Sequence, residues 1–488
     1  MKVKVRIAPS PSGPLHVGTA RSALFNFIFA RKHDGIFILR IEDTDVARTD
    51  KIYENEIREG LAWLGLNCDE FYRESDRFEL YQNHLKKLLD AGIIFWCSHS
   101  KDDLAREREA QMKNREAPRH ICFFRDGNPQ VDGGKAILRF KNNRSDVIEF
   151  DDIIRGKISF NPAILGDFSV ARSLESPLYN FAVVIDDALM EITHVIRGED
   201  LISSTPKQIL LFKALNFAIP EYAHIPLILN TDRSKLSKRK NPTSISQYRQ
   251  EGYLPEAMVN FLALLGWHPP SKIRNPTFES RASGRGKSEI RNEDIFSMSE
   301  LIMNFDLKDV QKGGAIFDAE KLNWINGEYI RKKTISDLSG GLAEFLKPEW
   351  RNDIKNDGGK WEKIVALEQP RLTRLGDINS RVDYFFEEPF ILKEELGWKN
   401  QKEGEIRANL MQLMEILKPI PENDFNKENL EKTISSLTQK LGAGEVLWPM
   451  RYALSGKRAS PGPFEIAEVL GKNKALARIS RAVELLAQ

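Results

Sequence analysis

The residues best suited to chemistry in this sequence lie near its N-terminus, in the segment Arg6–Ala20. Apolar and charged residues alternate over positions 2–7, which predicts a half-buried strand. A Pro/Ser/Gly-rich stretch follows, and from Gly18 onward the apolar periodicity predicts a helix. A strand, a turn of small residues and a helix N-terminus form an anion site, because backbone N–H groups and the helix dipole point at the ligand. His16 stands just before the helix, where its imidazole can donate a hydrogen bond to a phosphate oxygen.

A His-x-Gly motif alone is short enough to occur in an ordinary strand–turn–helix with a surface histidine. Here it is accompanied by Phe37–Asp45 (FILRIEDTD) and, far downstream, by Ser234–Lys240 (SKLSKRK). A lysine-rich run such as the latter would, on its own, indicate a solvated surface. In combination, the three segments closely resemble those of the bacterial glutamyl-tRNA synthetases, which are class I aminoacyl-tRNA synthetases.

The resemblance extends along most of the chain. His16–Thr19 (HVGT) corresponds to the family's "HIGH" signature, and Lys235–Arg239 (KLSKR) corresponds to its "KMSKS" signature. Val195–Asp200 and Phe317–Gly327 match in the expected order. The resemblance implies a glutamate–tRNA ligase that attaches L-glutamate to tRNA(Glu) through a glutamyl-adenylate. In this reaction ATP, bound with Mg²⁺, would be cleaved to AMP and diphosphate.

The implied reaction requires reactants held in line and charge neutralised on the transferring phosphate. His16 and the backbone at Gly18 suit the first task, while Lys235 and Lys238, on a loop that can close over the triphosphate, suit the second. These four are therefore the expected catalytic residues. The residues that the resemblance assigns to ATP are His16, Gly18, Thr19, Lys235, Leu236, Ser237, Lys238 and Arg239.

A glutamate pocket needs cations for the two carboxylates and an anion for the ammonium. The resemblance places Arg6, Ala8, Ser10, Glu42, Tyr179 and Arg197 around the amino acid. Arg6 and Arg197 can each bind a carboxylate bidentately, and Glu42 can pair with the ammonium. Some family members carry Asn where Val183 stands, so a polar contact from that position is absent here.

Two short motifs, Cys97-Ser98-His99 and His120-Ile121-Cys122, raise the question of a metal. Some relatives hold zinc in the acceptor-binding insertion through a Cys-x-Cys pair and a later Cys-x-His pair. Two cysteines and two histidines complete a tetrahedral set, although ligand types and spacing differ from those relatives. Two alternatives stay open: a structural Zn²⁺ held by Cys97, His99, His120 and Cys122, or two core cysteines with both histidines exposed.

The resemblance assigns Arg371 and Arg451 to the tRNA anticodon. Gln369–Leu372 (QPRL) lies where family members with Arg at the third position are thought to exclude the glutamine anticodon. The glutamate and glutamine anticodons differ at their third base, C against G. A guanidinium that donates to C fits the larger G poorly. Alternatively, Arg371 contacts only phosphate and adds affinity without discrimination. Whether tRNA(Gln) is also charged stays open.

The elements that must position these residues change character along the chain. The fold class expected is α/β: a Rossmann-like class I catalytic domain with an inserted acceptor-binding domain, followed by an all-α anticodon-binding region. Residues 101–116 and the apolar faces of 406–417 and 476–486 predict helices, and 181–185 reads as a buried strand. The expected divisions are 1–96 and 178–228 for the catalytic halves, 97–177 for the insertion, 229–335 for a stem-contact domain with the KLSKR loop, and 336–488 for the helical region.

Composition sets the broad class. With 488 residues, 41% hydrophobic and 29% charged, the sequence is typical of a multidomain globular protein, and no apolar run is long enough to cross a bilayer. The N-terminus lacks the apolar core of a signal peptide. Three cysteines cannot form a disulfide framework, which fits the cytoplasm. The net charge of +2 is uninformative, and a monomer is expected because monomers are usual among relatives.

Other functions fit less well. A relative that transfers glutamate to a tRNA base would lack the helical region after residue 330, and glutaminyl-tRNA synthetases usually carry His where Thr19 stands. A non-catalytic tRNA-binding paralogue should have lost His16 or the signature lysines, and a small-molecule adenylyltransferase would not need the helical half. Gly284–Ser288 is no P-loop, because Arg281 stands where the first glycine is needed. It belongs to a basic loop, 269–292, whose role the sequence does not define.

Overall fold

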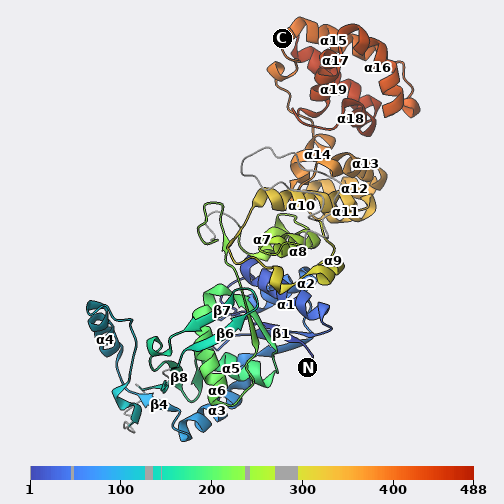
Figure 1. Ribbon diagram of the computed structural model, residues 1–488. Helices are drawn as coiled ribbons and strands as arrows, with labels where there is room; N and C mark the ends of the chain where they lie inside the picture. Colours follow the sequence, from blue (N-terminus) through green and yellow to red (C-terminus); the bar gives the residue numbers. More distant parts are fainter. Residues whose placement is uncertain (1, 45–48, 127–135, 144–145, 237–241, 270–294) are drawn as a thin grey trace. The chain divides into compact units, whose positions relative to one another are not determined.

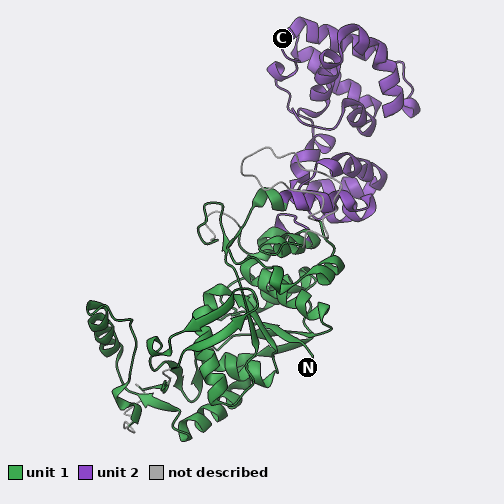
Figure 2. Cartoon of the chain, viewed as in Figure 1, with its two compact units in different colours: residues 1–249, 255–322 green, residues 250–254, 323–488 purple. Residues whose placement is uncertain are grey.

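The chain divides into two compact units (Figure 2). The computed structural model describes residues 2–44, 49–126, 136–143, 146–236, 242–269 and 295–488. Unit 1 contains residues 1–249 and 255–322, and unit 2 contains residues 250–254 and 323–488. Helices and strands mix in unit 1, whereas the described residues of unit 2 form helices and no strand (Figure 1). The mixed first part and the helical C-terminal region agree with the sequence pattern.

The described elements of unit 1 mix helices and strands, as the expected α/β fold class predicts. They are β1 (Lys4–Ile7), α1 (Val17–Lys32), β2 (Ile36–Ile41), α2 (Lys51–Trp63), β3 (Glu70–Arg73), α3 (Phe78–Asp90), β4 (Ile94–Cys97), α4 (Lys101–Lys113), β5 (Ile137–Phe140), β6 (Ile148–Asp152), β7 (Gly156–Phe160), β8 (Ser169–Ser173), β9 (Ser176–Pro177), α5 (Tyr179–Leu189), β10 (His194–Gly198), α6 (Thr205–Ala214), β11 (Glu221–Ile225), β12 (Ile228–Leu229), α7 (Ile245–Gln250), α8 (Pro255–Leu264), α9 (Met298–Asn304), β13 (Ala315–Ile316) and the start of α10 (Ala319–Lys332).

A parallel sheet carries the cavity described below. β1 pairs with β2, and β2 pairs with β3, all in parallel. On the other side, β10 follows β1, since the Thr193 N–H donates to the Lys4 carbonyl at 2.9 Å, and β10 pairs in parallel with β11. The antiparallel β6–β7 hairpin extends this side, with Asp152 opposite Tyr222. Parallel strands with crossover helices place their carboxyl ends together, and ligands bind there.

α1 is the helix that follows the first strand, and most of it is inside the unit. Twelve of its 16 residues are buried, including Arg21 and Asn26. It packs against β1, β10 and α8. The helix predicted from Gly18 onward is therefore confirmed, and it is covered on nearly all sides rather than along one face only.

The segment 181–185 is helical, so the strand predicted there is wrong. It belongs to α5, whose residues Phe181–Asp187 are all buried. α5 packs against α3, α6 and β8. A short continuous apolar run cannot be assigned to strand or helix by periodicity when every side of it is covered. The consequence for the site is that Tyr179, Val183 and Asp187 lie one helical turn apart.

A second sheet is antiparallel, has the strand order β4-β5-β8-β9 and is formed by strands between residues 94 and 177. α4 forms where the sequence predicts a helix from residue 101. None of the residues of α4 is buried, and its Ser100 N-cap forms a capping box with Asp103. The solvated charged helix and the small sheet position the two Cys/His motifs.

Unit 2 is built from α-helices and short helical turns in its described residues. After the end of α10 they are α11 (Ile335–Ala343), α12 (Arg351–Asn356), α13 (Gly358–Glu368), α14 (Ile378–Phe386), α15 (Glu403–Leu417), α16 (Lys427–Leu441), α17 (Ala443–Ser455), α18 (Pro463–Leu470) and α19 (Lys472–Leu485). α15 buries Ile406, Leu410, Leu413 and Leu417, the face that its sequence predicts, and it packs against α17 and α19.

Candidate active site

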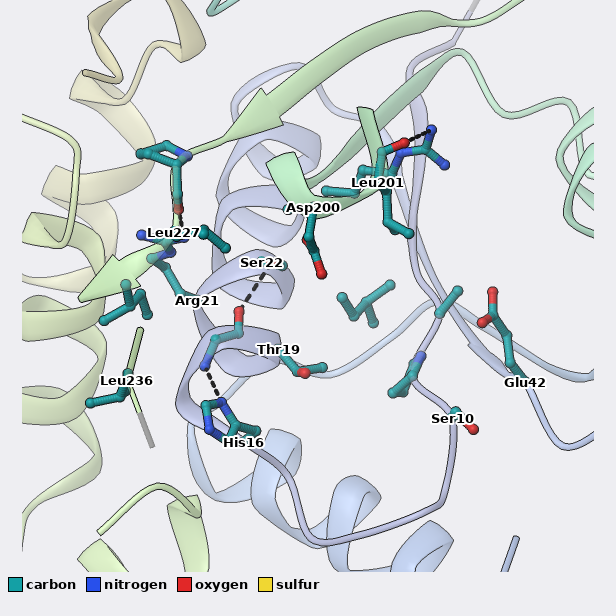
Figure 3. Close-up of a pocket in the computed structure, with 18 of the residues that line it drawn as sticks. Ser10, His16, Thr19, Arg21, Ser22, Glu42, Asp200, Leu201, Leu227 and Leu236 are labelled. Carbon is teal, nitrogen blue, oxygen red and sulfur yellow. Dashed lines mark hydrogen bonds between the residues drawn. The ribbon is translucent and has the colours of Figure 1, made fainter. Parts of the chain in front are cut away.

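A cavity of about 620 Å³ opens at the carboxyl ends of β1 and β10 and the N-terminus of α1. Figure 3 shows His16, Thr19 and Ser22 along α1, with Ser10 and Glu42 on the opposite side of the cavity. The residues that line it are Arg6, Ile7, Ala8, Pro9, Ser10, His16, Gly18, Thr19, Arg21, Ser22, Glu42, Tyr179, Arg197, Gly198, Asp200, Leu201, Pro226, Leu227, Ile228, Lys235 and Leu236. This set contains all six residues expected around glutamate and five of the eight expected around ATP.

His16 is the N-cap of α1. Its Nδ1 accepts a hydrogen bond from the Gly18 N–H at 3.0 Å (Figure 3). Because Nδ1 is the acceptor, the proton of the neutral ring lies on Nε2, which becomes a donor. A Cβ on Gly18 would lie 3.4 Å from His16 Nδ1, in ordinary van der Waals contact with the ring. The capping bond thus orients the imidazole at a helix N-terminus, where anions bind well.

Arg6 is buried and paired with a second buried residue, Asp187 of α5. Its Nε donates to Oδ1 and its Nη2 to Oδ2, both at 3.1 Å. From the sequence, Arg6 is expected to bind a substrate carboxylate bidentately. The Nε–Nη2 edge is instead occupied by Asp187, so that a ligand in the cavity can meet only the side that carries Nη1.

Behind the cavity lies a buried group of charges that sequence reasoning missed. Arg40 is fully buried and contacts Asp187 at 2.8 Å, Asp186 at 3.6 Å and Glu42 at 3.9 Å. Burial alone would lower the pKa of Arg40, but Asp187 and Asp186 raise it above its usual value. Burial raises the pKa of Glu42 and of nearby Glu74. Charged residues inside apolar runs were the available signal, because buried charges must be paired.

Arg197, at the end of β10, is held on two sides. Its Nε donates to His224 Nε2 at 3.2 Å, and its Nη2 donates to Thr205 Oγ1 at 2.8 Å. Its Nη1 is buried and has no hydrogen-bond partner among the residues that the structure describes. Arg197 is only 5% exposed and lines the cavity. A buried guanidinium nitrogen without a partner indicates a position for an anionic ligand atom.

The cavity is also lined by Arg21, Asp200, Lys235 and Leu236, and Figure 3 labels Arg21 and Leu236 on the side of α1 away from Ser10 and Glu42. Arg21 donates to the Leu265 carbonyl at 3.0 Å and to the Pro226 carbonyl, and burial lowers its pKa to about 10. Sequence reasoning missed Arg21 and Asp200. The remaining predicted ATP residues, Ser237, Lys238 and Arg239, lie outside the described residues, as does almost all of the basic loop with Gly284–Ser288.

The four Cys/His residues come together in unit 1. Their ligand atoms all lie within 4.8 Å of one another. Cys97 Sγ is 3.4 Å from His99 Nδ1 and 3.6 Å from His120 Nε2, and Cys122 Sγ is 3.5 Å from His99 Nδ1. Tetrahedral Zn²⁺ with ordinary bond lengths separates its ligands by about 3.4–3.8 Å. The cysteines are buried as in the core alternative, but neither histidine is exposed, so the residues fit a metal.

A carboxylate supports this cluster from outside. His120 Nδ1 lies 2.5 Å from Glu107 Oε2 of α4, which leaves Nε2 directed toward Cys97. A histidine that ligates a metal commonly donates its second nitrogen to a carboxylate. Glu107 is a residue that the motif spacing does not reveal.

In unit 2, Arg371 ends a short helical turn after α13 and is partly exposed. Its Nη1 lies 3.4 Å from Oε1 of Glu368, a fully buried carboxylate that also pairs with Arg381 at 3.7 Å. Arg451 lies over the Trp448 ring at 4.6 Å. Burial lowers the pKa of Arg451, and the charge of Arg371 adds to the effect. The two arginines expected at the anticodon are therefore near neighbours.

The chain is similar to known protein families over most of its length. Residues 2–324 match the family model described as "tRNA synthetases class I (E and Q), catalytic domain", and residues 341–483 match the "Anticodon binding domain". Among the described residues, no helix has the length and apolar character to cross a membrane.

Individual relatives agree with these matches. The chain is 40% identical to a "Glutamate--tRNA ligase" of Carboxydothermus hydrogenoformans, over 98% of this chain and 99% of the relative. It is 41% identical to one from Aquifex aeolicus, over 99% of both chains. A crystal structure of a glutamate tRNA ligase from Elizabethkingia meningosepticum, in complex with its amino acid, superposes with a TM-score of 0.83 at 31% identity, covering all of both chains.

Proposed function

The chain belongs to the glutamate–tRNA ligases of the class I tRNA synthetases, and we propose that the cavity of unit 1 is where it activates glutamate and transfers it to tRNA. The enzyme attaches glutamate to tRNA in translation. The observation that carries the assignment to this cavity is the convergence of Arg197, with an unpartnered buried Nη1, and the His16–Gly18 helix N-terminus on one space.

The proposed chemistry has two steps. A glutamate carboxylate oxygen attacks the α-phosphorus of ATP, and the bond to the bridging oxygen breaks to release diphosphate. A terminal ribose hydroxyl of tRNA then attacks the carbonyl carbon of the adenylate, loses its proton, and displaces AMP. Neither step needs a covalent bond to the protein, so the contribution of the residues is alignment and charge neutralisation.

For the amino acid, Arg197 Nη1 binds a carboxylate, and the Nη1 side of Arg6 lies in the same cavity. Ala8, Ser10 and Tyr179 complete the wall. Glu42 receives the ammonium. Burial raises the pKa of Glu42, and an arriving cation favours its ionised form, so binding and ionisation of this carboxyl support one another.

For ATP, His16 Nε2 donates to a phosphate oxygen and the α1 N-terminus, at Gly18 and Thr19, receives the negative charge. Lys235 and Leu236 line the same cavity. Ser237, Lys238 and Arg239 follow directly in sequence, and the two lysines neutralise charge on the departing diphosphate. Mg²⁺ enters with ATP and shields its phosphates.

We also assign a structural Zn²⁺ to Cys97, His99, His120 and Cys122. The support is the ligand spacing and the carboxylate of Glu107 on His120. When bound, the metal would tie the start of α4 to the segment around residue 120, with no position left for a reacting molecule. It is therefore a fold-stabilising site and takes no part in the chemistry.

For tRNA, we propose that residues 97–177 hold the acceptor end, that 1–96 and 178–228 form the catalytic halves, and that 229–335 contact the stem. The helical residues 336–488 read the anticodon through Arg371 and Arg451. tRNA(Glu) is the acceptor, and Arg371 disfavours tRNA(Gln). The enzyme works as a monomer of 55.8 kDa in the cytoplasm, where its three unpaired cysteines stay reduced.

The proposal is tested by aminoacylation with ATP, Mg²⁺ and labelled glutamate. Wild type should charge tRNA(Glu), and Arg197→Ala should lose charging mainly through a higher KM for glutamate, because one carboxylate contact is removed. Arg58→Ala, an exposed arginine of α2 that does not line the cavity, serves as an arginine control. Unchanged glutamate KM in Arg197→Ala would contradict the assignment of the cavity, and sedimentation at twice the chain mass would contradict the monomer.

A further inference from the structure

Three side chains from three neighbouring strands form a hydrogen-bonded series that ends at the cavity. On the parallel pair β10 and β11, Arg197 stands opposite His224, and on the next pair Tyr222 stands opposite Asp152 of β6. His224 Nδ1 lies 2.6 Å from Asp152 Oδ2, and Arg197 Nε donates to His224 Nε2 at 3.2 Å. The register of the sheet therefore connects a buried carboxylate to the substrate arginine through one imidazole.

Asp152 is the fixed end of this series. It is 3% exposed, and its two oxygens accept four hydrogen bonds, from the amides of Ile154, Arg155 and His224 and from the His224 ring. Burial would raise the pKa of Asp152, but these hydrogen bonds bring it below its usual value. An ionised carboxylate with all its acceptor positions in use is a rigid anchor.

The anchor determines which nitrogen of His224 carries the proton. A carboxylate can only accept, so Nδ1 carries the hydrogen and Nε2 presents its lone pair to Arg197. The charged groups around the ring are Asp152, Arg155 and Arg197, and Tyr222 stacks on it with an interplanar angle of 6°. Burial lowers the pKa of His224, and Arg197 adds to this effect, so the neutral ring that the geometry requires is the favoured form.

Two of the three guanidinium nitrogens of Arg197 are thereby fixed. Nε is held by His224, and Nη2 donates to Thr205 Oγ1 at 2.8 Å. Nη1 is the nitrogen without a hydrogen-bond partner among the described residues. We propose that Asp152, His224 and Thr205 are positioning residues that aim Arg197 Nη1 at the substrate carboxylate. This inference rests on the carboxylate-binding role proposed for Arg197.

The competing explanation is that the series only joins the strands. Two substitutions of His224 distinguish the explanations, because the amide groups of glutamine and asparagine can each replace one of the two ring nitrogens. In His224→Gln, the side-chain oxygen can take the place of Nε2 and accept from Arg197. In His224→Asn, the amide N–H can take the place of Nδ1 and keep Asp152, while the acceptor for Arg197 is lost.

The experiment is steady-state aminoacylation of full-length enzyme with glutamate, ATP and tRNA(Glu) each varied in turn. His224→Asn should raise the KM for glutamate about tenfold, the factor that corresponds to one charge-assisted hydrogen bond. The KM values for ATP and tRNA should stay within about twofold, and His224→Gln should recover most of the loss. His194→Gln, on the same strand as Arg197 and outside the cavity, should behave as wild type.

Thr205 supplies a second test if His224 variants fail to fold, and its Oγ1 also lies 3.2 Å from His224 Nε2. Thr205→Val keeps the shape of the side chain and removes the acceptor, so it should raise the glutamate KM, whereas Thr205→Ser should restore it. The inference would be overturned if a variant raised all three KM values and lowered kcat together. It would also be overturned if His224→Asn and His224→Gln behaved equally. Arg197→Lys is measured alongside. If Arg197→Lys also leaves the glutamate KM unchanged, Arg197 does not bind the carboxylate, and the inference fails with that role. If Arg197→Lys raises the glutamate KM but the His224 and Thr205 variants do not, only the positioning role fails.

Discussion

Three arginines at the candidate sites each contact a buried partner. Asp187 holds Arg6, His224 holds Arg197, and Glu368 lies against Arg371. Such pairing fixes the direction of a guanidinium before a ligand arrives, so less side-chain entropy is lost on binding. It also explains why removing Asp187 should be costly, since Arg6 is then left buried and charged.

His16 gives the first residue-scale prediction, because its ring has two separate tasks. His16→Ala should lower kcat/KM, with a loss of transition-state stabilisation of roughly 3 kcal/mol if Nε2 is a preorganised donor to the transition state. The same change removes the acceptor of the Gly18 N–H and should cost about 1 kcal/mol of unfolding free energy. Aminoacylation kinetics and thermal unfolding measure the two effects.

A matched variant separates these tasks. His16→Asn can still cap α1 through its side-chain oxygen, but it offers no group at the position of Nε2. We expect its stability to return to that of wild type while its rate stays near that of His16→Ala. Wild-type charging by either variant would rule out the phosphate contact.

Arg371 gives the second residue-scale prediction. Arg371→Gln should narrow the preference for tRNA(Glu) over tRNA(Gln), because the fixed fork that disfavours the larger base is removed. The ratio of kcat/KM for the two transcripts measures this. Arg381→Gln is the control, since Arg381 pairs with the same buried Glu368. An equal loss with both tRNAs would instead assign Arg371 to the phosphate backbone.

At the scale of elements, the cluster at β4 and α4 predicts a metal-dependent segment. Metal-replete protein should contain about one zinc per chain, and Cys97→Ser or Cys122→Ser should remove it and lower the temperature of unfolding. Cys68→Ser is the control, because Cys68 lies outside the cluster. Elemental analysis that finds no zinc in the wild type would leave ordinary core packing as the role of both cysteines.

The helices and strands also show which parts of the fold can be predicted from the sequence. β1 and α1 were predictable, because a strand that alternates and a turn rich in small residues are local signals. α5 was not, since a run buried on every side loses its periodicity. With α5 misassigned, Asp187 could not be placed beside Arg6. His224 carried no signal either, because only the pairing of β10 with β11 brings it to Arg197.

At the scale of the whole molecule, one tRNA must be bound by a chain whose net charge is only +2. Basic surface must therefore be local, and most of the affinity for tRNA should come from phosphate contacts. In the proposed pocket, in contrast, glutamate would meet side chains that are shielded from counterions, because Arg6 is 3% exposed and Arg197 is 5% exposed.

Salt should thus act on the two substrates differently. The logarithm of the tRNA affinity should fall linearly with the logarithm of salt concentration, with a slope of about −0.7 to −0.9 for each phosphate neutralised. The KM for glutamate should change little over the same range, because burial excludes the ions that would screen its pocket. Initial rates of aminoacylation at several KCl concentrations measure both values from one preparation. A steep rise of the glutamate KM with salt would mean that the amino acid binds at a solvated surface, and the assignment to the buried cavity would then be wrong.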